Sequence, residues 1–255
     1  MNQFNKIICW YGFPDQLSAE VAESGFHSVL SETEKARNLR YRHDRDRRLH
    51  LLARLMVRSL LSGLEPEIRP AAWIFDQDIY GKPYISGPAN GINRFHFNVS
   101  HTDGLVVVAI STCGIVGVDV ENPSRATDYL GLAHRFFSAI ESEQIRNGES
   151  ARQVSEFFRI WTLKEAYVKA IGKGLAHGLD SFWFKRAASD SIDLEKSDLF
   201  LIDQASGESR NEDAWDCWTW QVGEEPGWVI SVVAGRGSEA RRNELEIRPF
   251  EIRKI

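Results

Sequence analysis

The sequence predicts an α+β protein with a sizeable core. Hydrophobic residues make up 43% of the 255 positions and charged residues 26%, a balance typical of folded rather than disordered chains. Each half of the chain contains helical patterns that are followed by strand patterns, which is compatible with a duplicated unit. The length fits one large domain or two fused halves, and we expect the halves to be 1–114 and 115–255.

The first half is expected to contain two helices and several strands. Ser31 and Glu34 have the spacing of a capping box, which predicts a helix start. A second helix has a stripe of leucines on one face and ends before Gly63. The expected elements are strands at 7–13, 73–75, around 84, 95–99 and 105–110, and helices from 31 and at 45–62.

The second half is expected to begin with a strand at 115–121. That strand follows the turn at 112–114, so we expect it to form a hairpin with 105–110. Ser138 and Glu141 form another capping box, and Gly172 is placed to end a long helix. The remaining expected elements are helices at 139–147 and 151–171, strands near 181–185, 194–202, 215–222 and 228–234, and a polar loop at 203–213.

The charge distribution limits the classes of partner. A net charge of −5 argues against a general binder of nucleic acids. The segment 35–58 is nevertheless strongly basic, with Asp44 and Asp46 as its only acids. Such a run is either a solvated helix face or a clamp for a phosphate-rich ligand or an acidic partner.

Cysteine usage and hydropathy favour a cytoplasmic protein with no membrane partner. The three cysteines are widely spaced and indicate neither a zinc site nor a disulfide framework, so we expect reduced thiols. Residues 1–6 lack the apolar core of a signal peptide, and no apolar run is long enough to span a bilayer.

The segment 117–121 is the first of two motifs that carry most of the functional information. Valines alternate with Gly117, Asp119 and Glu121, and the two-residue period of a strand places both acids on one face, roughly 6–7 Å apart. Two surface acids are the plain alternative. The apolar strand before them and the turn at 122–123 favour a rigid edge that could hold a metal ion.

The segment 161–169 is the second motif and is expected to be helical. Trp161, Glu165 and Lys169 recur every four residues and so share one face. A surface ion pair of this spacing stabilises a helix by about 0.2–0.5 kcal/mol. This helix is apolar on most sides, however, and a buried charge is costly without a partner. Together with Asp119 and Glu121, the motif supplies three carboxylates and an ammonium, which suit Mg²⁺ and phosphoryl-type chemistry.

Two weaker signals could add phosphate contacts. Lys82 presents a cation on the turn 81–83. Ser100 and His101 follow the strand 95–99 in a polar turn, where an imidazole could reach a phosphate at the sheet edge. Each signal is weak by itself.

Five motifs in order closely resemble those of the Sfp-type 4′-phosphopantetheinyl transferases. They are Gly-Lys-Pro at 81–83, Phe-Asn-Val-Ser-His at 97–101, Gly-Val-Asp-Val-Glu at 117–121, Phe-Phe-Ser at 136–138, and the long motif at 161–175. The resemblance implies a pseudo-twofold monomer of two similar α/β halves with the active site between them. It also implies coenzyme A as donor, a serine of an apo acyl or peptidyl carrier protein as acceptor, and holo carrier protein and adenosine 3′,5′-bisphosphate as products.

The resemblance also implies a role for each site residue. Asp119, Glu121 and Glu165 correspond to the family's metal ligands, for Mg²⁺ or alternatively Mn²⁺, and Lys169 to its phosphate-contacting lysine. The coenzyme A contacts would be Lys82, Ser100, His101, Arg47, Arg48 and Lys35.

We expect Asp119, Glu165 and Lys169 to be the catalytic residues. Glu165 would take the serine proton, directly or through a metal-bound water, and Lys169 would neutralise the leaving bisphosphate. Carrier proteins are expected to dock on the loop after Glu121 and on 136–144, with Arg135 contributing.

Two alternatives remain open from the sequence. A metal-dependent nuclease also uses an aspartate followed by Glu-x-Lys, but here the spacing is Glu-x-x-x-Lys on a predicted helix. A non-catalytic module that binds coenzyme A or a carrier protein would be indicated by loss of an acid or of the lysine, and all four residues are present.

Overall fold

The computed structural model describes residues 6–89, 91–124, 128–187, 194–202, 208–224, 226–237 and 243–251. The chain divides into two compact units. Unit 1 comprises Met1–Cys113 and Glu244–Ile255, and unit 2 comprises Gly114–Asn243. Helices and strands occur in both units, which confirms the predicted α+β class.

Unit 1 contains a four-stranded sheet of order β12-β1-β5-β4 and a separate hairpin of β2 and β3. Its strands are β1 (Lys6–Gly12), β2 (Ile74–Gln77), β3 (Pro83–Gly87), β4 (His96–Thr102), β5 (Leu105–Ser111) and β12 (Glu244–Pro249). Its α-helices are α1 (Ala19–Ser28), α2 (Glu32–Arg40) and α3 (Asp44–Leu64), and short 3-10 helices lie at Pro14–Gln16 and Pro70–Ala72.

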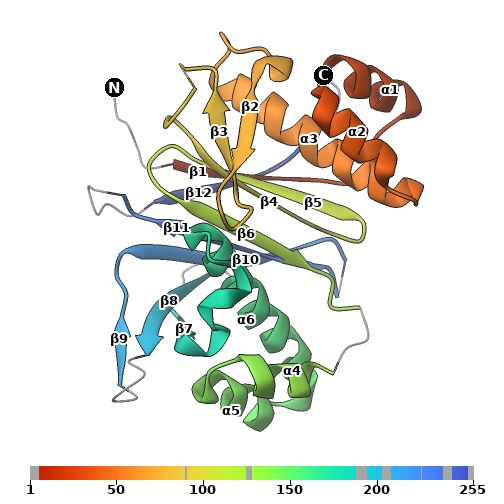
Figure 1. The fold of residues 1–255 in the computed structure, drawn as a ribbon. Coiled ribbons are helices and arrows are strands. Elements are labelled where there is room, and N and C mark those ends of the chain that lie inside the picture. The colour runs from red at the N-terminus through yellow and green to blue at the C-terminus, as the bar shows by residue number, and fades with distance from the viewer. Residues whose placement is uncertain are drawn as a thin grey trace. The chain divides into compact units, whose positions relative to one another are not determined.

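The long helix α3 holds unit 1 together. It packs against β4 and β5, and α1 and α2 pack against α3 (Figure 1). The predicted leucine stripe lies in this interface, where Leu52 and Met56 join Val106 and Val108 in a buried cluster. The capping box of Ser31 and Glu34 at the start of α2 is confirmed.

Unit 2 contains a sheet of order β6-β11-β10-β8-β7, with β9 paired to β8. Its strands are β6 (Val116–Glu121), β7 (Phe182–Arg186), β8 (Glu195–Ile202), β9 (Ser209–Asn211), β10 (Trp215–Val222) and β11 (Trp228–Gly235). Its α-helices are α4 (Tyr129–Phe136), α5 (Ala139–Asn147) and α6 (Ser150–Ile171), and 3-10 helices lie at Gly174–His177 and Leu179–Ser181.

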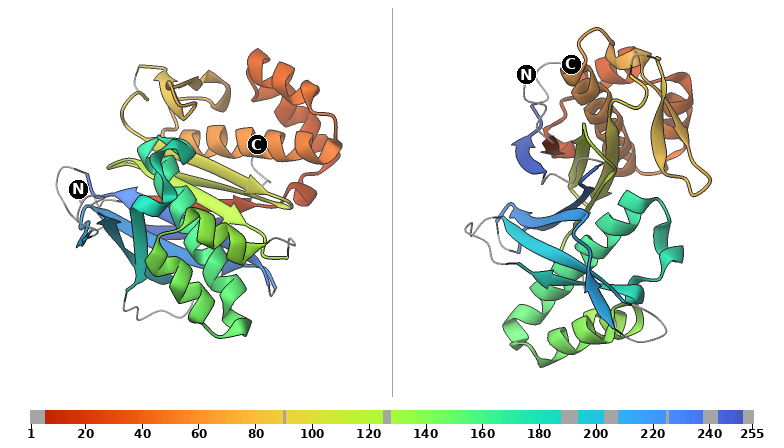
Figure 2. Two further views of the ribbon diagram at one scale, coloured as in Figure 1. Left: turned by 60° about the horizontal axis from the view of Figure 1, so that its bottom comes forward. Right: turned by 90° about the vertical axis from the view of Figure 1, so that its left-hand side faces the viewer.

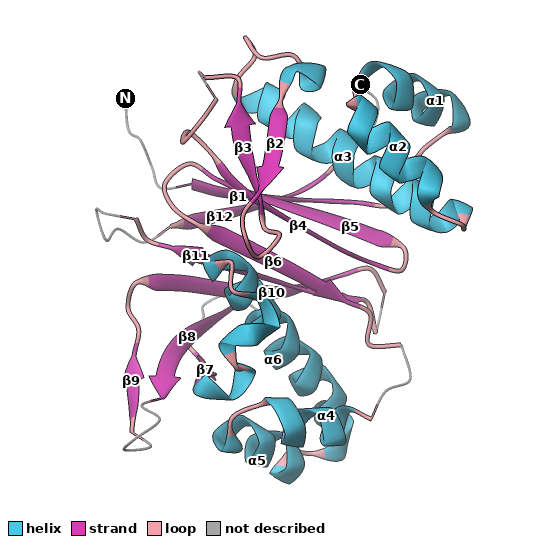
Figure 3. Ribbon diagram, viewed as in Figure 1, coloured by secondary structure: helices cyan, strands magenta, loops and turns pink. Residues whose placement is uncertain are grey.

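Helix α6 is the central helix of unit 2. It lies along the sheet, mainly over β6 and β11, and α4 and α5 pack beside it (Figure 2). Within each unit the helices lie on one face of the main sheet (Figure 3). The capping box of Ser138 and Glu141 opens α5, and Gly172 ends α6 in the left-handed conformation with φ of +72°, as predicted.

The structure corrects the predicted hairpin of 105–110 with 115–121. β5 pairs with β1 and β4, whereas β6 pairs with β11 in the other sheet. The tight turn after β4 uses Asp103 and Gly104, with φ of +83° at Gly104, so β5 forms its hairpin with the strand before it. His101 accordingly lies within β4 rather than in a turn.

The last strand also differs from the predicted halves. β12 pairs in parallel with β1, which is why residues from Glu244 onward cluster with unit 1 rather than with the second half. The division of the chain into domains at 114 and 115 stays a prediction. Across the described part of the chain, no helix is both long and apolar enough to cross a membrane.

Candidate functional site

Strand β6 places Asp119 on the face of its sheet that α6 covers. Gly117 and Asp119 point to the same face because side chains alternate along a strand. Asp119 lies opposite Ser231 of β11 and is only 4% exposed. Glu121 lies two residues further along that face and is half-buried.

The close approach of α6 to β6 depends on Gly117. A Cβ atom at this position would lie 2.0 Å from the carbonyl oxygen of Ala166 and 2.5 Å from the backbone nitrogen of Ala170. A side chain there would therefore push the helix away. A second tie is the buried hydrogen bond between the hydroxyls of Thr162 and Ser231, at 2.7 Å.

This packing brings the two predicted motifs together. Lys169 Nζ donates to Asp119 Oδ1 at 2.6 Å. The Asp119 side chain is 5% exposed and that of Lys169 is 29% exposed, so the ion pair lies at the edge of the buried region. Glu165 lies one helical turn before Lys169 on α6.

The pKa of Glu165 depends on both members of that ion pair. Burial raises the pKa of Glu165, and the negative charge of Asp119 raises it further, while Lys169 partly offsets the increase. A carboxylate whose pKa is shifted toward neutrality is a better proton acceptor for general base catalysis. The arrangement therefore combines a proton acceptor with a cation on one helix face.

The donor chemistry at this position fits a hard divalent cation. Carboxylate oxygens such as those of Asp119, Glu121 and Glu165 are the ligands that Mg²⁺ prefers. Within the ranges that the structure describes, however, no group of three His, Cys, Asp or Glu side chains is arranged to hold a metal ion. The ammonium of Lys169 is bonded to Asp119 instead. The metal ligand set stays a prediction.

In unit 1, three predicted coenzyme A contacts make structural contacts of their own. Arg47 donates from Nε to the Tyr41 carbonyl at 3.0 Å. Arg48 donates to the carbonyls of two residues of the segment that links β1 to α1, at 2.6 and 2.7 Å. Lys35 pairs with Glu32 at 2.8 Å. Their roles toward coenzyme A stay predictions.

Two donors that the sequence analysis missed lie on one face of α3, four residues apart. His50 Nδ1 faces the amide nitrogen of Asn38 at 3.1 Å and so accepts its hydrogen, which places the proton of the neutral imidazole on Nε2. His50 Nε2 and Arg54 Nε are both buried and make no hydrogen bond. A buried donor without a partner is costly, so this pair is suited to an anionic ligand.

The electrostatic surroundings of His50 and Arg54 are mixed, because Arg37 and the carboxylate of Glu34 both act on them, and Glu34 lies 3.9 Å from Arg54 Nη1. Burial lowers the pKa of His50 to about 4, and the charges of Arg54 and Arg37 contribute in the same direction. Burial likewise lowers the pKa of Arg54. The four-residue spacing of His50, Arg54 and Arg58 within the leucine-rich segment 45–62 was the available sequence signal.

The remaining predicted contacts lie on β4 and beside β3. Ser100 is buried, whereas His101 is exposed and close enough to His50 to influence its pKa. Lys82 precedes β3, and its turn is held by Asp78, whose carboxylate accepts from the backbone nitrogen of Lys82 at 2.9 Å. Burial lowers the pKa of Lys82 to about 8, and Asp78 partly offsets this.

A fully buried ion pair anchors the middle of α6. Lys164 Nζ lies 2.7 Å from Glu141 Oε2 and also donates to the carbonyls of Leu179 and Phe182. The second oxygen of Glu141 accepts from the backbone nitrogen of Phe184 at 3.0 Å. These contacts tie α6 to α5 and to the start of β7.

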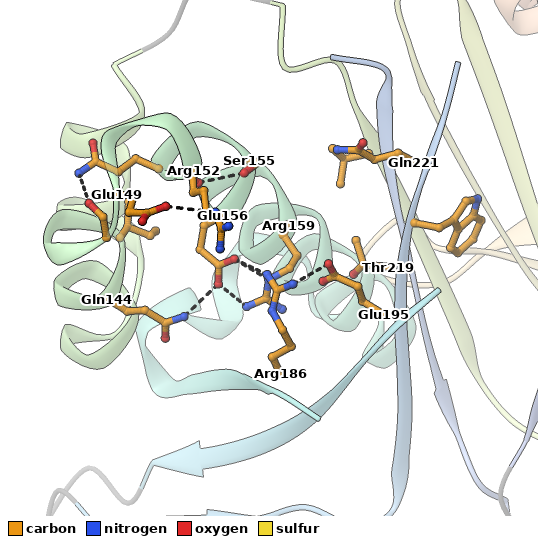
Figure 4. A pocket seen from close by; sticks show the side chains of 15 residues that line it. Gln144, Glu149, Arg152, Ser155, Glu156, Arg159, Arg186, Glu195, Thr219 and Gln221 are labelled. Atoms are coloured by element: carbon orange, nitrogen blue, oxygen red, sulfur yellow. Dashed lines mark hydrogen bonds and ion pairs between the residues drawn. The ribbon is translucent and has the colours of Figure 1, made fainter. Parts of the chain in front are cut away.

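A cavity of about 840 Å³ lies in unit 2 beside the first turns of α6 and contains none of the predicted site residues (Figure 4). Its charged groups bond one another. Glu156 accepts from Gln144, Arg159 and Arg186, and Arg186 also donates to Glu195. We interpret this network as a structural link between α5, α6, β7 and β8.

Two family models match the chain. The model described as the 4′-phosphopantetheinyl transferase superfamily matches residues 115–233. The model described as the N-terminal part of 4′-phosphopantetheinyl transferases matches residues 20–113. The matches fall on either side of residue 114 and include every predicted site residue.

Three individual relatives whose names contain 4′-phosphopantetheinyl transferase, one of them as putative, also match the chain. A protein of Synechocystis sp. is 34% identical over 160 residues, which cover 61% of this chain and 62% of the relative. The 4′-phosphopantetheinyl transferase gsp of Aneurinibacillus migulanus is 32% identical over 179 residues, 70% of this chain and 71% of the relative. The 4′-phosphopantetheinyl transferase Sfp of Bacillus subtilis is 29% identical over 189 residues, 74% and 81% of the two chains. The chain thus spans less than two thirds of the first relative.

Proposed function

Because the chain belongs to the Sfp-type 4′-phosphopantetheinyl transferase family, we propose that it transfers the phosphopantetheine arm of coenzyme A to a serine of an apo acyl or peptidyl carrier protein. The products are the holo carrier protein and adenosine 3′,5′-bisphosphate. The observation that carries the proposal is the cluster of Asp119, Glu165 and Lys169, where α6 crosses β6.

The chain's own residues support the acid–base part of this reaction. The serine oxygen forms a bond to the phosphorus that bears the pantetheine, and the bond from that phosphorus to the bisphosphate oxygen breaks. Glu165, whose pKa is raised by burial, accepts the serine proton. Lys169 compensates the negative charge that develops on the departing bisphosphate.

A divalent ion is part of the proposal. Asp119, Glu121 and Glu165 would hold Mg²⁺, and Mn²⁺ would be accepted by the same oxygen donors. When bound, the ion would neutralise the pyrophosphate of coenzyme A and polarise the phosphorus under attack.

Unit 1 is proposed to bind the phosphates of coenzyme A. Lys82, Ser100, His101, Arg47, Arg48 and Lys35 are the contacts predicted from the sequence. The buried N–H groups of His50 and Arg54 extend this set, since each could donate a hydrogen bond to a phosphate oxygen.

The partner and its docking surface are further parts of the proposal. Residues 136–144 and Arg135 are proposed to contact an acidic carrier protein; Ile140 of this region is 43% exposed. The loop after Glu121 was also expected to contribute, and its residues 125–127 lie outside the described residues. We further propose that the protein works as a monomer in the cytoplasm, without a nucleic acid or membrane partner.

The two alternatives are less well supported. The relatives carry the name of a transferase rather than of a nuclease, and Glu165 and Lys169 lie on α6 rather than on adjacent strands. A non-catalytic module would not need the complete set of three acids and a lysine, which this chain retains.

The test is intact mass spectrometry of several apo carrier proteins incubated with the protein, coenzyme A and Mg²⁺. We expect the mass of one phosphopantetheine arm to be added to a serine. Asp119→Ala should abolish the addition, while Asp213→Ala, which removes an exposed aspartate, should not. Full transfer by Asp119→Ala would refute the assignment of this residue, and no transfer by the unmodified protein to any carrier would refute the function.

A further inference from the structure

We propose that Lys169 neutralises Asp119 as long as no metal is bound, and that a divalent ion must displace the lysine from Asp119 in order to bind. This displacement makes the lysine available to the substrate phosphates. The inference rests on the proposed function, because it concerns the order in which the same site is filled. It assigns Lys169 a role before chemistry as well as during it.

The contact that carries the inference is the hydrogen-bonded ion pair. Lys169 Nζ lies 2.6 Å from Oδ1 of Asp119, within the range of a strong charge-assisted hydrogen bond. The aspartate side chain is 5% exposed, and a buried carboxylate is costly to a fold unless it is paired. The ammonium is its partner.

A divalent ion and the ammonium compete for this carboxylate. Sharing Oδ1 would bring the two cations so close that their repulsion is strong even at a partly solvated site. Moving α6 away from the sheet would break the buried hydrogen bond between Thr162 and Ser231 and open a gap at the close contact of Gly117 with Ala166. The lysine side chain is therefore the part that moves.

The side chain of Lys169 can move toward solvent. Its side chain is 29% exposed, so the ammonium can leave Asp119 toward solvent without crossing the core. Glu165 lies one helical turn before Lys169, and its carboxylate interacts electrostatically with both Asp119 and Lys169. An ion that binds the two carboxylates thus replaces the charge that the lysine provided.

This competition couples metal binding to phosphate binding. An ammonium released from Asp119 gains most by contacting a phosphate, so a substrate phosphate favours the metal-bound arrangement. By linkage, the metal must then favour substrate binding by the same factor. The ion pair of Lys169 with Asp119 is thus the arrangement without ligands, and the metal and coenzyme A each favour its separation.

The test measures Mn²⁺ binding by electron paramagnetic resonance on the full chain without coenzyme A. We expect Lys169→Met to bind Mn²⁺ at least about fivefold more tightly than the unmodified protein, a factor within the usual range of coupling between sites. Lys173→Met removes an exposed lysine four residues later and should leave the dissociation constant unchanged. Asp119→Asn should weaken binding strongly, which shows that the measured ion is held at this site.

Lys169→Gln is a second variant that removes the charge and keeps a hydrogen-bond donor. It should also bind Mn²⁺ more tightly than the unmodified protein. If circular dichroism shows that Lys169→Met is unfolded, Lys169→Gln is the variant that tests the inference. Equal or weaker Mn²⁺ binding by the folded Lys169 variants would overturn the inference, as would unchanged binding by Asp119→Asn. Transfer by the unmodified protein is measured separately, so the inference can fail while the proposed function stands.

Discussion

Lys164 and Glu141 form an ion pair in which neither side chain is exposed to solvent, with Nζ and Oε2 2.7 Å apart. Each charge is also hydrogen-bonded: the lysine to two carbonyls, and the glutamate to the backbone and hydroxyl of Ser138 and to the backbone of Phe184. Because the pair fixes α6 beside α5, it supports the helix that carries Glu165 and Lys169.

The first prediction follows from that burial. Lys164→Met should lower the free energy of unfolding by roughly 3–5 kcal/mol, because it leaves the carboxylate of Glu141 buried without its counter-ion. The double variant Lys164→Met/Glu141→Gln removes both charges and should recover a large part of the loss. Urea denaturation measures both. A loss below about 1 kcal/mol in the single variant would contradict a buried charged pair.

The second prediction concerns the glycine under α6. Gly117→Ala should reduce both stability and transfer, because the added Cβ would collide with backbone atoms of Ala166 and Ala170 rather than with a flexible side chain. Gly63→Ala is the matched control, since that position has open space around it. In the helix α3 the control should be neutral or stabilising by up to about 1 kcal/mol. Thermal unfolding and the carrier protein assay compare the two, and equal behaviour would argue against the close approach.

The two functional motifs were readable from sequence because they depend on local periodicity. The alternation in 117–121 predicted the strand and the shared face of its acids, and the four-residue spacing predicted the shared face of Glu165 and Lys169. Their meeting was a hypothesis, and the contact of Lys169 with Asp119 bears it out. The metal expected between them stays a prediction.

The errors arose where pairing is non-local. β6 lies next to β11, far along the chain, with Asp119 opposite Ser231, and no local pattern specifies that register. The short turn at 112–114 favoured a hairpin that does not form. β12 was missed because three of the six residues of its strand, Glu244–Pro249, are charged, and because the strand forms by pairing with β1.

His50 escaped notice for a different reason. In a leucine-rich helix a lone histidine is usually a core residue with satisfied hydrogen bonds, and nothing in the sequence shows that Nε2 is left without a partner. That fact depends on Asn38, which α2 brings beside α3 and which binds the other ring nitrogen.

The third prediction uses the pKa of His50, which burial lowers from 6.5 to about 4. Between these values the unfolded chain takes up a proton that the folded chain does not, so stability is complete above about pH 6.5 and is lost as the pH falls toward 4. The pKa difference corresponds to roughly 3 kcal/mol at most. Urea denaturation at about pH 7 and about pH 4.5 should show a larger loss in the unmodified protein than in His50→Gln, by roughly 2 kcal/mol. Equal losses of unfolding free energy in the two proteins would mean that burial does not lower the pKa of His50.

The last prediction concerns Lys82, whose pKa burial lowers to about 8. A lysine with this pKa is mostly charged at about pH 7 and mostly neutral at about pH 9, so its attraction for a phosphate should disappear over that interval. The KM for coenzyme A should therefore rise as the pH increases through 8. Lys82→Arg keeps its charge throughout this range, so its KM should rise less than that of the unmodified protein.

The arginine variant separates Lys82 from other groups that titrate in the same interval, because those groups affect both proteins equally. We expect the ratio of the two KM values to change by up to about tenfold between about pH 7 and about pH 9, which is the change in the protonated fraction for a pKa near 8. The same shift makes the fold more stable at high pH: between about 8 and 10.5 the unfolded chain holds a proton that the folded chain has released. A KM ratio that stays constant with pH would show that Lys82 does not contact a phosphate of coenzyme A in its charged form.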